Sequence, residues 1–555
     1  MTTEDLQHAA TSDHEDAIDV LVIGAGVAGV EQLYELRSRG LDALVVDAAG
    51  GIGGTWWWNR YPGCRFDSES YSYGYFFDRQ LYADWSWSEH YAGQPETERY
   101  LNHVVDRYGL RPFIRLNTRV ARMEFDDEEN VWRTTTTAGD TITSRFVVTG
   151  IGRLSQPQYP ATPGRETFRG IQHHTGLWPA EPVDFAGKRV AVVGVGSSGV
   201  QIAPHIAAVA EHLTVFQSTP NWCAPLRNSP ITDEEQTKIK ASFDEIHDAC
   251  VSTAAGFIHR FQTGTAQDLT PEERRAFYEE LWQRPGFAKM FSNYPQVVGV
   301  REFNDEFSAF VADKIRERVK DPVVAEMLIP KDHGYGQKRP PHEEGFYEIF
   351  NQPNVKLIDV KATPMLEITP TGITTTEAHV ELDIIVYATG YDALTGAFDQ
   401  IDIRAGGRSL KEAWAEGPQT QMGLATPGFP NMFYIGGPQS GGGNAPRCIE
   451  PQVEFLARLI ADATSRGFDR VEATEAAAEA WTEHVNSTVA GTLGAVAKKD
   501  WSWGSNTPGK KVVYRSYAAG LPTYLAKLKD VEDNGWAGFE LSAAEQTAPV
   551  VTAGA

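Results

Sequence analysis

Residues 19–29 read Asp-Val-Leu-Val-Ile-Gly-Ala-Gly-Val-Ala-Gly, and this stretch decides the fold. Its first half is a continuous apolar run with β-branched residues, which is typical of a parallel strand covered on both faces. Its second half carries three glycines in the GxGxxG pattern, Gly24, Gly26 and Gly29. A strand that feeds such a turn into a helix presents free amides and the positive end of the helix dipole, which together can hold a pyrophosphate.

The residues that follow continue this βαβ order. We expect a helix over residues 30–39 that ends at Gly40, and then a second strand over residues 43–46. Asp47 closes that strand roughly 20 residues after the last glycine, where a carboxylate binds a ribose hydroxyl. The N-terminal region is therefore predicted to bind a dinucleotide.

A second fingerprint stands at residues 189–199, Arg-Val-Ala-Val-Val-Gly-Val-Gly-Ser-Ser-Gly. We expect a helix from Ser198 to about residue 208 and a strand over residues 213–216 that leads to Gln217. The candidate cofactor contacts of this turn are Gly194, Gly196, Ser197, Ser198 and Gly199. One glycine-rich turn is a weak signal. Two in the same context indicate that two dinucleotides meet in one chain, as in electron transfer from a nicotinamide to a flavin.

Two apolar runs that end in Thr-Gly, at residues 146–150 and 383–390, mark where the chain crosses between the two units. We therefore predict an α/β fold with two Rossmann-like dinucleotide-binding domains and a helical insertion. The expected parts are an FAD-binding domain (residues 18–152 and 382–542), an NADP-binding domain (153–227 and 326–381), a helical insertion (228–325), a disordered tail (1–17) and a C-terminal tail (543–555).

Helix-start signals predict the insertion. Thr232 with Glu235, and Thr270 with Glu273, have the spacing of capping boxes. Pro271 stands at the first helical position of the second box, where its missing N–H costs nothing. We expect this insertion to form a lid or a wall of the substrate site.

Composition and charge exclude several classes of partner. The formal net charge is −24 at pH 7, which disfavours nucleic acid and anionic membranes. The sequence contains no run of about 18 uncharged apolar residues, so we expect no membrane-spanning helix. Residues 1–16 are polar and acidic, and they lack the basic start and apolar core of a signal peptide.

The four cysteines, Cys64, Cys223, Cys250 and Cys448, are scattered and include no CxxC pair. Their spacing predicts neither a zinc site nor a redox-active disulfide, and we expect no metal. It fits a reducing compartment, so we expect a cytoplasmic protein. A pyridine nucleotide–disulfide reductase is disfavoured because the CxxC pair is missing.

Two further motifs narrow the chemistry. Residues 168–179, Phe-Arg-Gly-Ile-Gln-His-His-Thr-Gly-Leu-Trp-Pro, have the form FxGxxxHxxxWP. Residues 53–67 begin Gly-Gly-Thr-Trp-Trp-Trp-Asn-Arg-Tyr-Pro-Gly and end at Asp67. With these motifs, and with further elements at residues 331–340 and 501–510, the chain resembles the type I Baeyer–Villiger monooxygenases over residues 18–540.

The resemblance implies an enzyme that holds FAD, consumes NADPH and O2, and converts ketones to esters or lactones through a C4a-peroxyflavin. To attack a ketone, the peroxide must be anionic, and a fixed cation in a dry pocket stabilises it and the tetrahedral intermediate that follows. Arginine suits this task because it keeps its proton and presents several donors. By resemblance, Arg339 is the catalytic cation, and the carboxylate of Asp67 positions it.

The resemblance also assigns cofactor contacts, and the chain departs from the family at two of them. Asp47 stands where the family more often has glutamate, and Ser218 where it usually has arginine. Serine offers a 2′-phosphate one hydrogen bond but no charge, so Lys338 is left as the cation that favours NADPH over NADH. Besides the two fingerprints and Asp47, the assigned contacts are Thr55, Trp56, Asp67, Tyr73, Gln217, Ser218, Lys338 and Trp501.

The FxGxxxHxxxWP residues are Phe168, Gly170, His174 and Trp178. A histidine invites a general-base role. In the family, however, this signature lies in a linker between the domains, where it couples their movement. We therefore expect His174 and Trp178 to act as hinge or hydrogen-bonding residues, with direct acid–base catalysis by His174 as the alternative.

Two other functions stay open. One is a flavin monooxygenase that oxygenates nitrogen or sulfur in its substrates, since that class shares both glycine fingerprints. The other is a non-catalytic dinucleotide-binding sensor that kept the fold, because fold alone does not establish function. The class of ketone is also open, as is the choice between a monomer and a homodimer.

Overall fold

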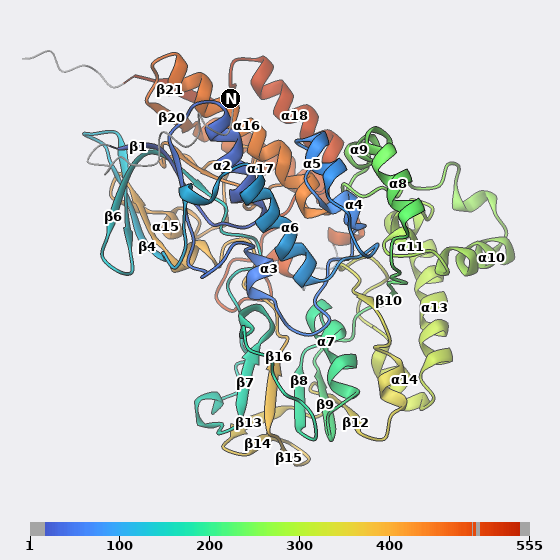
Figure 1. Ribbon diagram of the computed structural model, residues 1–555. Helices are drawn as coiled ribbons and strands as arrows, with labels where there is room; N and C mark the ends of the chain where they lie inside the picture. Colours follow the sequence, from blue (N-terminus) through green and yellow to red (C-terminus); the bar gives the residue numbers. More distant parts are fainter. Residues whose placement is uncertain (1–16, 491, 496–499, 544–555) are drawn as a thin grey trace, which may run out of the picture.

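The computed structural model describes residues 17–490, 492–495 and 500–543 (Figure 1). Apart from residues 17 and 543, the predicted tails lie outside these ranges. Two sheets built around parallel strands lie one below the other in Figure 1, and a group of helices flanks them. The predicted α/β fold with two Rossmann-like domains and a helical insertion is confirmed.

The first sheet forms around β1 (Ile18–Ile23), whose central residues are fully buried. β1 pairs in parallel with β2 (Ala43–Val46) on one side and with β6 (Thr141–Thr149) on the other. The strand order is β18-β17-β4-β5-β6-β1-β2-β3, and β19 also pairs with β6. The other strands of this sheet are β3 (Ile114–Arg115), β4 (Val120–Asp126), β5 (Val131–Thr136), β17 (Asp402–Ala405), β18 (Arg408–Ser409) and β19 (Met432–Tyr434).

Helices from both ends of the chain complete this domain. α2 (Val27–Ser38) packs on β1 and β2, and the long α16 (Ala445–Ser465) packs on α2. Segments far apart in the sequence therefore share one core (Figure 1). The other elements around it are α3 (Thr55–Trp58), α4 (Ser70–Tyr73), α5 (Arg79–Asp84), α6 (Gln94–Arg107), α15 (Leu410–Ala413), α17 (Glu475–Ala490), α18 (Leu521–Asp533), β20 (Arg470–Ala473) and β21 (Phe539–Ser542).

The second sheet is wholly parallel, with the order β12-β9-β8-β16-β7. Its strands are β7 (Ile171–His174), β8 (Arg189–Val193), β9 (His212–Gln217), β12 (Val355–Asp359) and β16 (Ile384–Tyr387), and α7 (Ser197–Ala207) follows β8. The predicted domain boundary at residue 382 falls too early, because β16 pairs with β7 and β8 in this sheet. An apolar run identifies a buried strand but not the sheet that it joins.

The insertion is helical, and both predicted capping boxes are present, at Thr232 with Glu235 and at Thr270 with Glu273. Its helices flank both sheets on one side of the molecule (Figure 1). They are α8 (Asp233–Ala241), α9 (Phe243–Ser252), α10 (Pro271–Trp282), α11 (Ala288–Phe291), α12 (Gln296–Gly299), α13 (Arg301–Arg318) and α14 (Pro322–Leu328). Short strands β10 (Ala224–Pro225) and β11 (His342–Glu343) pair where the chain enters and leaves the insertion.

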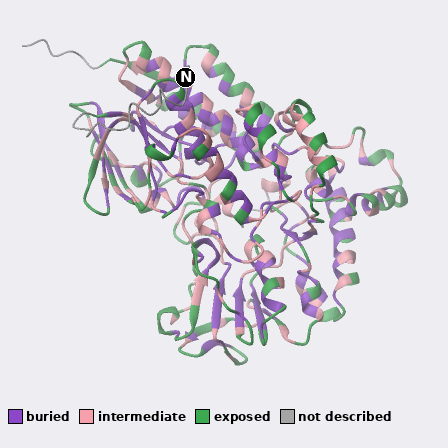
Figure 2. Ribbon diagram, viewed as in Figure 1, coloured by how far each residue is buried: buried purple, intermediate pink, exposed green. Residues whose placement is uncertain are grey.

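Burial follows the sheets, with both parallel cores buried and the outer faces of the flanking helices exposed (Figure 2). A three-stranded antiparallel sheet of β13 (Met365–Thr369), β14 (Gly372–Thr375) and β15 (His379–Glu381) extends the second domain. Within the ranges given above, no helix combines the length and the apolar character that crossing a bilayer requires.

Candidate functional site

The first glycine fingerprint forms a turn that only glycine can make. Gly24 has a φ of +111°, and a Cβ added there would lie 2.5 Å from the carbonyl oxygen of Gly150. A Cβ at Gly29 would lie 1.7 Å from the carbonyl oxygen of Gly24. Gly26 is the N-cap of α2, and no side chain of the described residues caps this helix end. The first amides of α2 therefore remain available to an anionic ligand.

Asp47 closes β2 beside this turn, as predicted. Its Oδ2 accepts a hydrogen bond of 2.5 Å from the amide of Ala25, and its Oδ1 one of 2.7 Å from the amide of Ala49. Burial raises the pKa of Asp47. Because each carboxylate oxygen can accept more than one hydrogen bond, Asp47 can hold the turn and still receive a ribose hydroxyl.

The second fingerprint repeats this geometry at the start of α7. Gly194 has a φ of +107°, and a Cβ there would lie 2.4 Å from the carbonyl oxygen of Ala388, at the end of β16. A Cβ at Gly199 would lie 2.1 Å from the carbonyl oxygen of Gly194. Gly196 and Ser197 are exposed at this helix end, which no side chain of the described residues caps. This turn is thus a second place for a pyrophosphate.

We call residues 53–67 the tryptophan block. Its side chains Trp56 and Phe66 form, together with Tyr73, an aromatic floor next to the first fingerprint. Trp56 is buried, and its indole N–H donates to the hydroxyl of Tyr73 over 3.1 Å. The ring of Tyr73 stacks on Phe66 with 4.2 Å between centroids. Thr55, by contrast, is exposed at the start of α3. The Gly53–Gly54 turn that precedes α3 lies against Gly26, because a Cβ at Gly54 would be 2.9 Å from the Gly26 Cα.

Asp67 and Arg339 form an ion pair with 2.5 Å between Oδ1 and Nη2. Nη1 of Arg339 also lies 3.4 Å from the carbonyl oxygen of Gly443. Its guanidinium carbon lies 4.7 Å from the ring centre of Phe287, within the range of a cation–π contact. The side chain of Arg339 is 39% exposed and that of Asp67 is 17% exposed. The cation is thus anchored on several sides and still reaches the surface of the site.

His342, which the sequence did not single out, completes this cluster. Its buried ring lies edge-on against Phe287, with 4.4 Å between centroids, and its Nδ1 is 3.6 Å from Oδ2 of Asp67. Burial pushes the pKa of Asp67 upward. Arg339 and His342 outweigh that effect and hold the pKa of Asp67 well below its usual range. Asp67 is therefore ionised at neutral pH.

The FxGxxxHxxxWP segment joins the two domains. Its residues Ile171–His174 are β7, the edge strand of the second sheet. The amide of Trp178 then donates to the carbonyl of Trp58 in the tryptophan block over 3.0 Å. A Cβ at Gly170 would lie 2.3 Å from the carbonyl oxygen of Asp383, so the backbones pass too closely for another residue. Phe168 is buried in the core of the second domain.

His174 is buried within this connection. Its Nδ1 accepts a hydrogen bond of 3.0 Å from the amide of Gly176. Its ring meets the ring of Tyr391 at 5.7 Å, and the hydroxyl of Tyr391 donates to Asn59 over 2.6 Å. Burial lowers the pKa of His174 to about 4. A neutral histidine that accepts a backbone hydrogen bond fits the hinge or hydrogen-bonding role better than acid–base catalysis.

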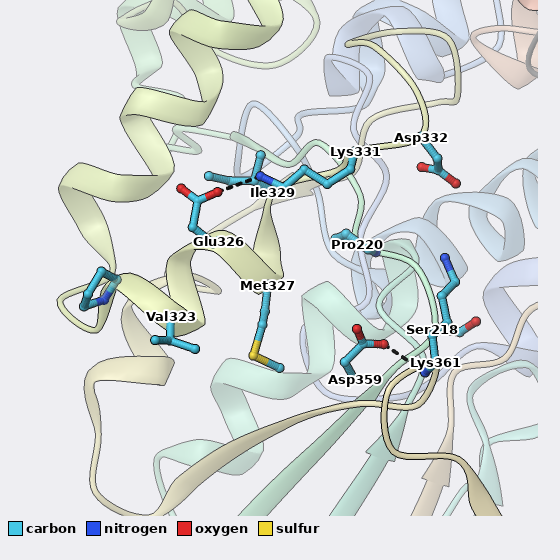
Figure 3. A pocket seen from close by; sticks show the side chains of 11 residues that line it. Ser218, Pro220, Val323, Glu326, Met327, Ile329, Lys331, Asp332, Asp359 and Lys361 are labelled. Atoms are coloured by element: carbon cyan, nitrogen blue, oxygen red, sulfur yellow. Dashed lines mark hydrogen bonds and ion pairs between the residues drawn. The ribbon is translucent and has the colours of Figure 1, made fainter.

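A cavity of about 590 Å³ lies at the carboxyl edge of the second sheet (Figure 3). Ser218, predicted as a cofactor contact, lines it together with Lys331, Asp332, Asp359 and Lys361. Its other lining residues come mainly from α14 and the loop after it (Figure 3).

Two other predicted contacts lie outside the lining of this cavity. Gln217 is buried, and its side-chain amide donates to the carbonyl of Met327 over 2.8 Å, so it ties β9 to α14. Lys338 lies close enough to Asp332 to lower the pKa of that carboxyl.

Trp501 begins a short turn at residues Trp501–Trp503 and is half-buried. The preceding residue, Asp500, acts electrostatically on His333, which places this turn near the segment that carries Lys338 and Arg339. Farther along, Lys510 forms an ion pair of 2.7 Å with Asp392. Residues 500–510 therefore lie against both the second domain and the segment that follows β16, which carries Asp392.

All four cysteines are buried and free, and burial raises the pKa of each thiol. A redox-active thiol is usually exposed and has a lowered pKa. None of these cysteines has the environment of a disulfide reductase.

Comparison with known proteins agrees with this geometry. The sequence profile of the pyridine nucleotide-disulphide oxidoreductases matches residues 21–256. A 2-oxo-Δ3-4,5,5-trimethylcyclopentenylacetyl-CoA monooxygenase of Pseudomonas putida is 42% identical over 95% of this chain and 98% of its own. A Baeyer–Villiger monooxygenase of Pseudooceanicola batsensis is 39% identical over 93% of this chain and 95% of its own. This chain belongs to the Baeyer–Villiger monooxygenases.

The fold agrees as well. The crystal structure of OTEMO in complex with FAD and NADP has a TM-score of 0.92 and 41% identity, and the match covers 95% of this chain and 99% of that one. The predicted family is thereby confirmed.

The residues of this Baeyer–Villiger monooxygenase fit two dinucleotides. Each fingerprint contains a glycine whose Cβ would collide with a backbone carbonyl, and each leads into a helix whose first amides lack a side-chain cap among the described residues. Asp47 lies beside the first turn, and Ser218 lines the cavity beyond the second. The first site has the donors and the acceptor that FAD requires, and the second has the donors that NADP requires.

Sequence reasoning missed three side chains in this Baeyer–Villiger monooxygenase: Phe287, His342 and Lys361. No local pattern marks them, because each matters only through a partner distant in the chain. Gly443, whose carbonyl lies near Arg339, is different, since three successive glycines at residues 441–443 are visible in the sequence.

Proposed function

We propose that this protein oxidises ketones to esters or lactones, with consumption of NADPH and O2 and release of NADP+ and water. The observation that carries the proposal is the Asp67–Arg339 ion pair beside the aromatic floor of the FAD-binding domain. Membership of the family and the two dinucleotide sites support it. FAD, when bound, supplies the redox centre that accepts hydride from NADPH and activates O2.

Arg339 is the proposed catalytic residue. Its guanidinium is a cation with several hydrogen-bond donors, so it can stabilise negative charge that develops on oxygen during attack on the ketone. Asp67 takes one Nη of the guanidinium, and the 39% exposure of the side chain leaves further donors for the reacting atoms. Asp67 fixes the orientation of this cation and acts as a positioning residue.

The remaining residues bind and orient. Gly24, Gly26 and Gly29 admit the FAD pyrophosphate to the start of α2, and Asp47 receives a ribose hydroxyl. Trp56 and Tyr73, joined by a hydrogen bond of 3.1 Å, would provide an aromatic surface for the flavin and help to exclude water from its site. For NADPH, the proposed contacts are the α7 turn together with Gln217, Ser218, Lys338 and Trp501. Thr55, exposed next to the Gly54 turn, completes the FAD site.

The signature segment couples the domains in this proposal. Trp178 bonds to the tryptophan block, and β7 belongs to the second sheet, so a shift of either domain pulls on the other. His174 keeps the turn between them in one shape through its hydrogen bond from Gly176. Neither side chain needs to reach the reacting atoms for this role.

A product assay with ketones and a thioether also distinguishes the proposed function from two rival functions. A monooxygenase restricted to nitrogen or sulfur would oxidise a thioether but not a ketone. A non-catalytic sensor would bind dinucleotides without turnover, although the intact Asp67–Arg339 pair speaks against that function.

The deciding experiment is a panel of linear, cyclic and aryl ketones with O2 and NADPH, analysed for esters and lactones by mass spectrometry, with a thioether in parallel. We expect a yellow protein that NADPH bleaches and that forms an ester or lactone from at least one ketone. A colourless protein, or one that turns over the thioether and none of the ketones, would overturn the proposal.

A cytoplasmic location is part of the proposal. Four buried, free thiols fit a reducing compartment. Fractionation of the native host should find the protein with cytoplasmic markers.

A further inference from the structure

The cavity at the carboxyl edge of the second sheet is built by two neighbouring strands. β9 and β12 run parallel with Gln217 opposite Asp359, and the amide of Val360 donates to the carbonyl of Gln217 over 2.8 Å. Beyond these strand ends, two side chains face the same space. Ser218 follows β9 and Lys361 follows β12, and both line the cavity of about 590 Å³ (Figure 3).

The end of β9 is where a Rossmann fold reads the 2′ position of the adenosine ribose. A carboxylate there binds the free hydroxyl of NADH, and an arginine nearby accepts the 2′-phosphate of NADPH. In this chain, residues 217–219 are Gln-Ser-Thr, which carry neither charge. A charged group that distinguishes the 2′-phosphate of NADPH from the 2′-hydroxyl of NADH must therefore come from another segment.

The cationic groups of the cavity are Lys331 and Lys361, and they are not equivalent. Lys331 forms an ion pair of 2.7 Å with Glu326, which itself pairs with Arg316 at 2.7 Å. The amino group of Lys361 forms no ion pair with a carboxylate among residues 17–490, 492–495 and 500–543. Figure 3 shows its side chain in the rim that also carries Ser218. Lys361 is exposed, so its flexible stem can follow a ligand.

The acidic groups that face this space already have partners. Oδ1 of Asp359 accepts the amide of Lys361 over 2.9 Å, which shapes the turn after β12. Asp332 lies 2.6 Å from Nδ1 of His333, and Lys338 and Lys361 both act on it electrostatically. Lys338 and Lys361 thus both lie near Asp332, although they come from two different segments, and Ser218 lines the same cavity as Asp332 and Lys361.

We propose that Lys361 is the specificity-determining cation that selects the 2′-phosphate of NADPH, in the place that an arginine at position 218 would fill. Ser218 donates one hydrogen bond to the phosphate, and Lys338 supplies the second charge. The inference rests on the proposed use of NADPH and adds a residue from the end of β12, the neighbour of β9 in the second sheet, to the recognition of the cofactor.

The test measures binding rather than turnover. The FAD-loaded protein is titrated by calorimetry with 2′,5′-ADP and 5′-AMP, which differ only in the 2′-phosphate, and then with NADP+ and NAD+. We expect Lys361→Ala to weaken 2′,5′-ADP and NADP+ binding about 10- to 100-fold, the range of one lost charged hydrogen bond, and to leave 5′-AMP and NAD+ unchanged. Lys361→Arg should keep the preference.

Two further variants sharpen the result. Lys356→Ala removes an exposed lysine from the other end of the same strand and should change none of the four affinities. Ser218→Arg combined with Lys361→Ala should recover the 2′,5′-ADP affinity, because the charge then returns from β9.

The outcomes separate the two proposals. If the unmodified protein binds 2′,5′-ADP and 5′-AMP equally well, the proposed preference for NADPH is overturned, and so is the proposed role of Lys361. If the protein discriminates and Lys361→Ala binds all four ligands as before, or loses them equally, only the role of Lys361 is overturned. The role of Lys361 is likewise overturned if Lys356→Ala reproduces the effect.

Discussion

Arg339 donates to Asp67 over 2.5 Å, although 272 residues separate them in the chain. Phe287 from the insertion and Gly443 from the loop before α16 contact the same guanidinium. Both domains and the insertion must therefore be in place before the cation is positioned. The pair is a consequence of the complete fold, and it makes the site sensitive to changes at its supports as well as at Arg339 itself.

Arg339→Ala should separate reduction from oxygenation. The variant should bind FAD and oxidise NADPH, because neither step uses the guanidinium. Its ester or lactone formation should fall by at least about 100-fold, the usual effect of removing one preorganised donor. NADPH consumption and product are measured together, and hydrogen peroxide should account for the difference. Lactone formation at the rate of the unmodified protein would remove Arg339 from the catalytic role.

Lys338→Ala should act on the cofactor preference. We expect its KM for NADPH to rise about tenfold and its KM for NADH to change little, because only the 2′-phosphate loses a charged partner. Steady-state kinetics with both cofactors provide the measurement, and Lys320→Ala, an exposed lysine outside the cavity, is the matched control. Equal changes with NADPH and NADH would exclude Lys338 from this contact.

Gly443→Ala should disturb the catalytic cation indirectly, because a distorted turn would shift the carbonyl of Gly443 that lies near Arg339. Gly443 has a φ of +154°, and a Cβ there would lie 2.1 Å from the carbonyl oxygen of Ala255. We expect a loss of about 1–3 kcal/mol in unfolding free energy and a larger loss in ketone oxygenation than in NADPH oxidation. Gly441→Ala is the control on the same loop, since a Cβ there meets no atom within 4 Å. Similar behaviour of the two variants would contradict the role assigned to this turn.

His174 should make the folded state sensitive to acid. Burial lowers the pKa of His174 from 6.5 to about 4. Between these two pH values the histidine binds a proton in the unfolded chain but not in the folded one. Stability should therefore fall as the pH drops from about 6.5 toward 4, by up to about 3 kcal/mol from this residue. Urea unfolding at a series of pH values measures the slope.

Two variants test whether His174 causes this dependence of stability on pH. His174→Asn keeps an acceptor for the Gly176 amide but cannot take up a proton, so its stability should depend less on pH in this window. His212→Asn, at an exposed histidine of β9, should leave the slope unchanged. An unaltered slope in His174→Asn would mean that other groups cause the acid sensitivity.

Local patterns predicted the parts of the structure whose geometry is local. The GxGxxG turns are readable because a positive φ at Gly24 and Gly194 and the close backbone contacts at Gly29 and Gly199 demand glycine whatever surrounds them. The capping boxes at Thr232 and Thr270 are readable for the same reason, since both partners lie within one helical turn. Buried strands such as β1 and β8 followed from their apolar runs.

The tertiary structure decided which strands and side chains meet. The apolar run of β16 fits either sheet, and only its pairing with β7 and β8 assigns it to the second one. Gln217 stands where a cofactor contact is expected, yet its amide bonds to Met327 because α14 packs over the strand end. Resemblance pointed to Arg339 and Asp67, but their anchors, Phe287 and His342, became visible only in the fold.

The sequence alone therefore determined the two dinucleotide turns, the helix starts and the family, because backbone conformation and capping depend on neighbours in the chain. The tertiary structure alone determined how Arg339 is held and that Lys361 shares a cavity with Ser218, because these contacts join segments that lie far apart in the chain. Their distances depend on how the sheets and helices pack, and no interval of sequence encodes that packing by itself.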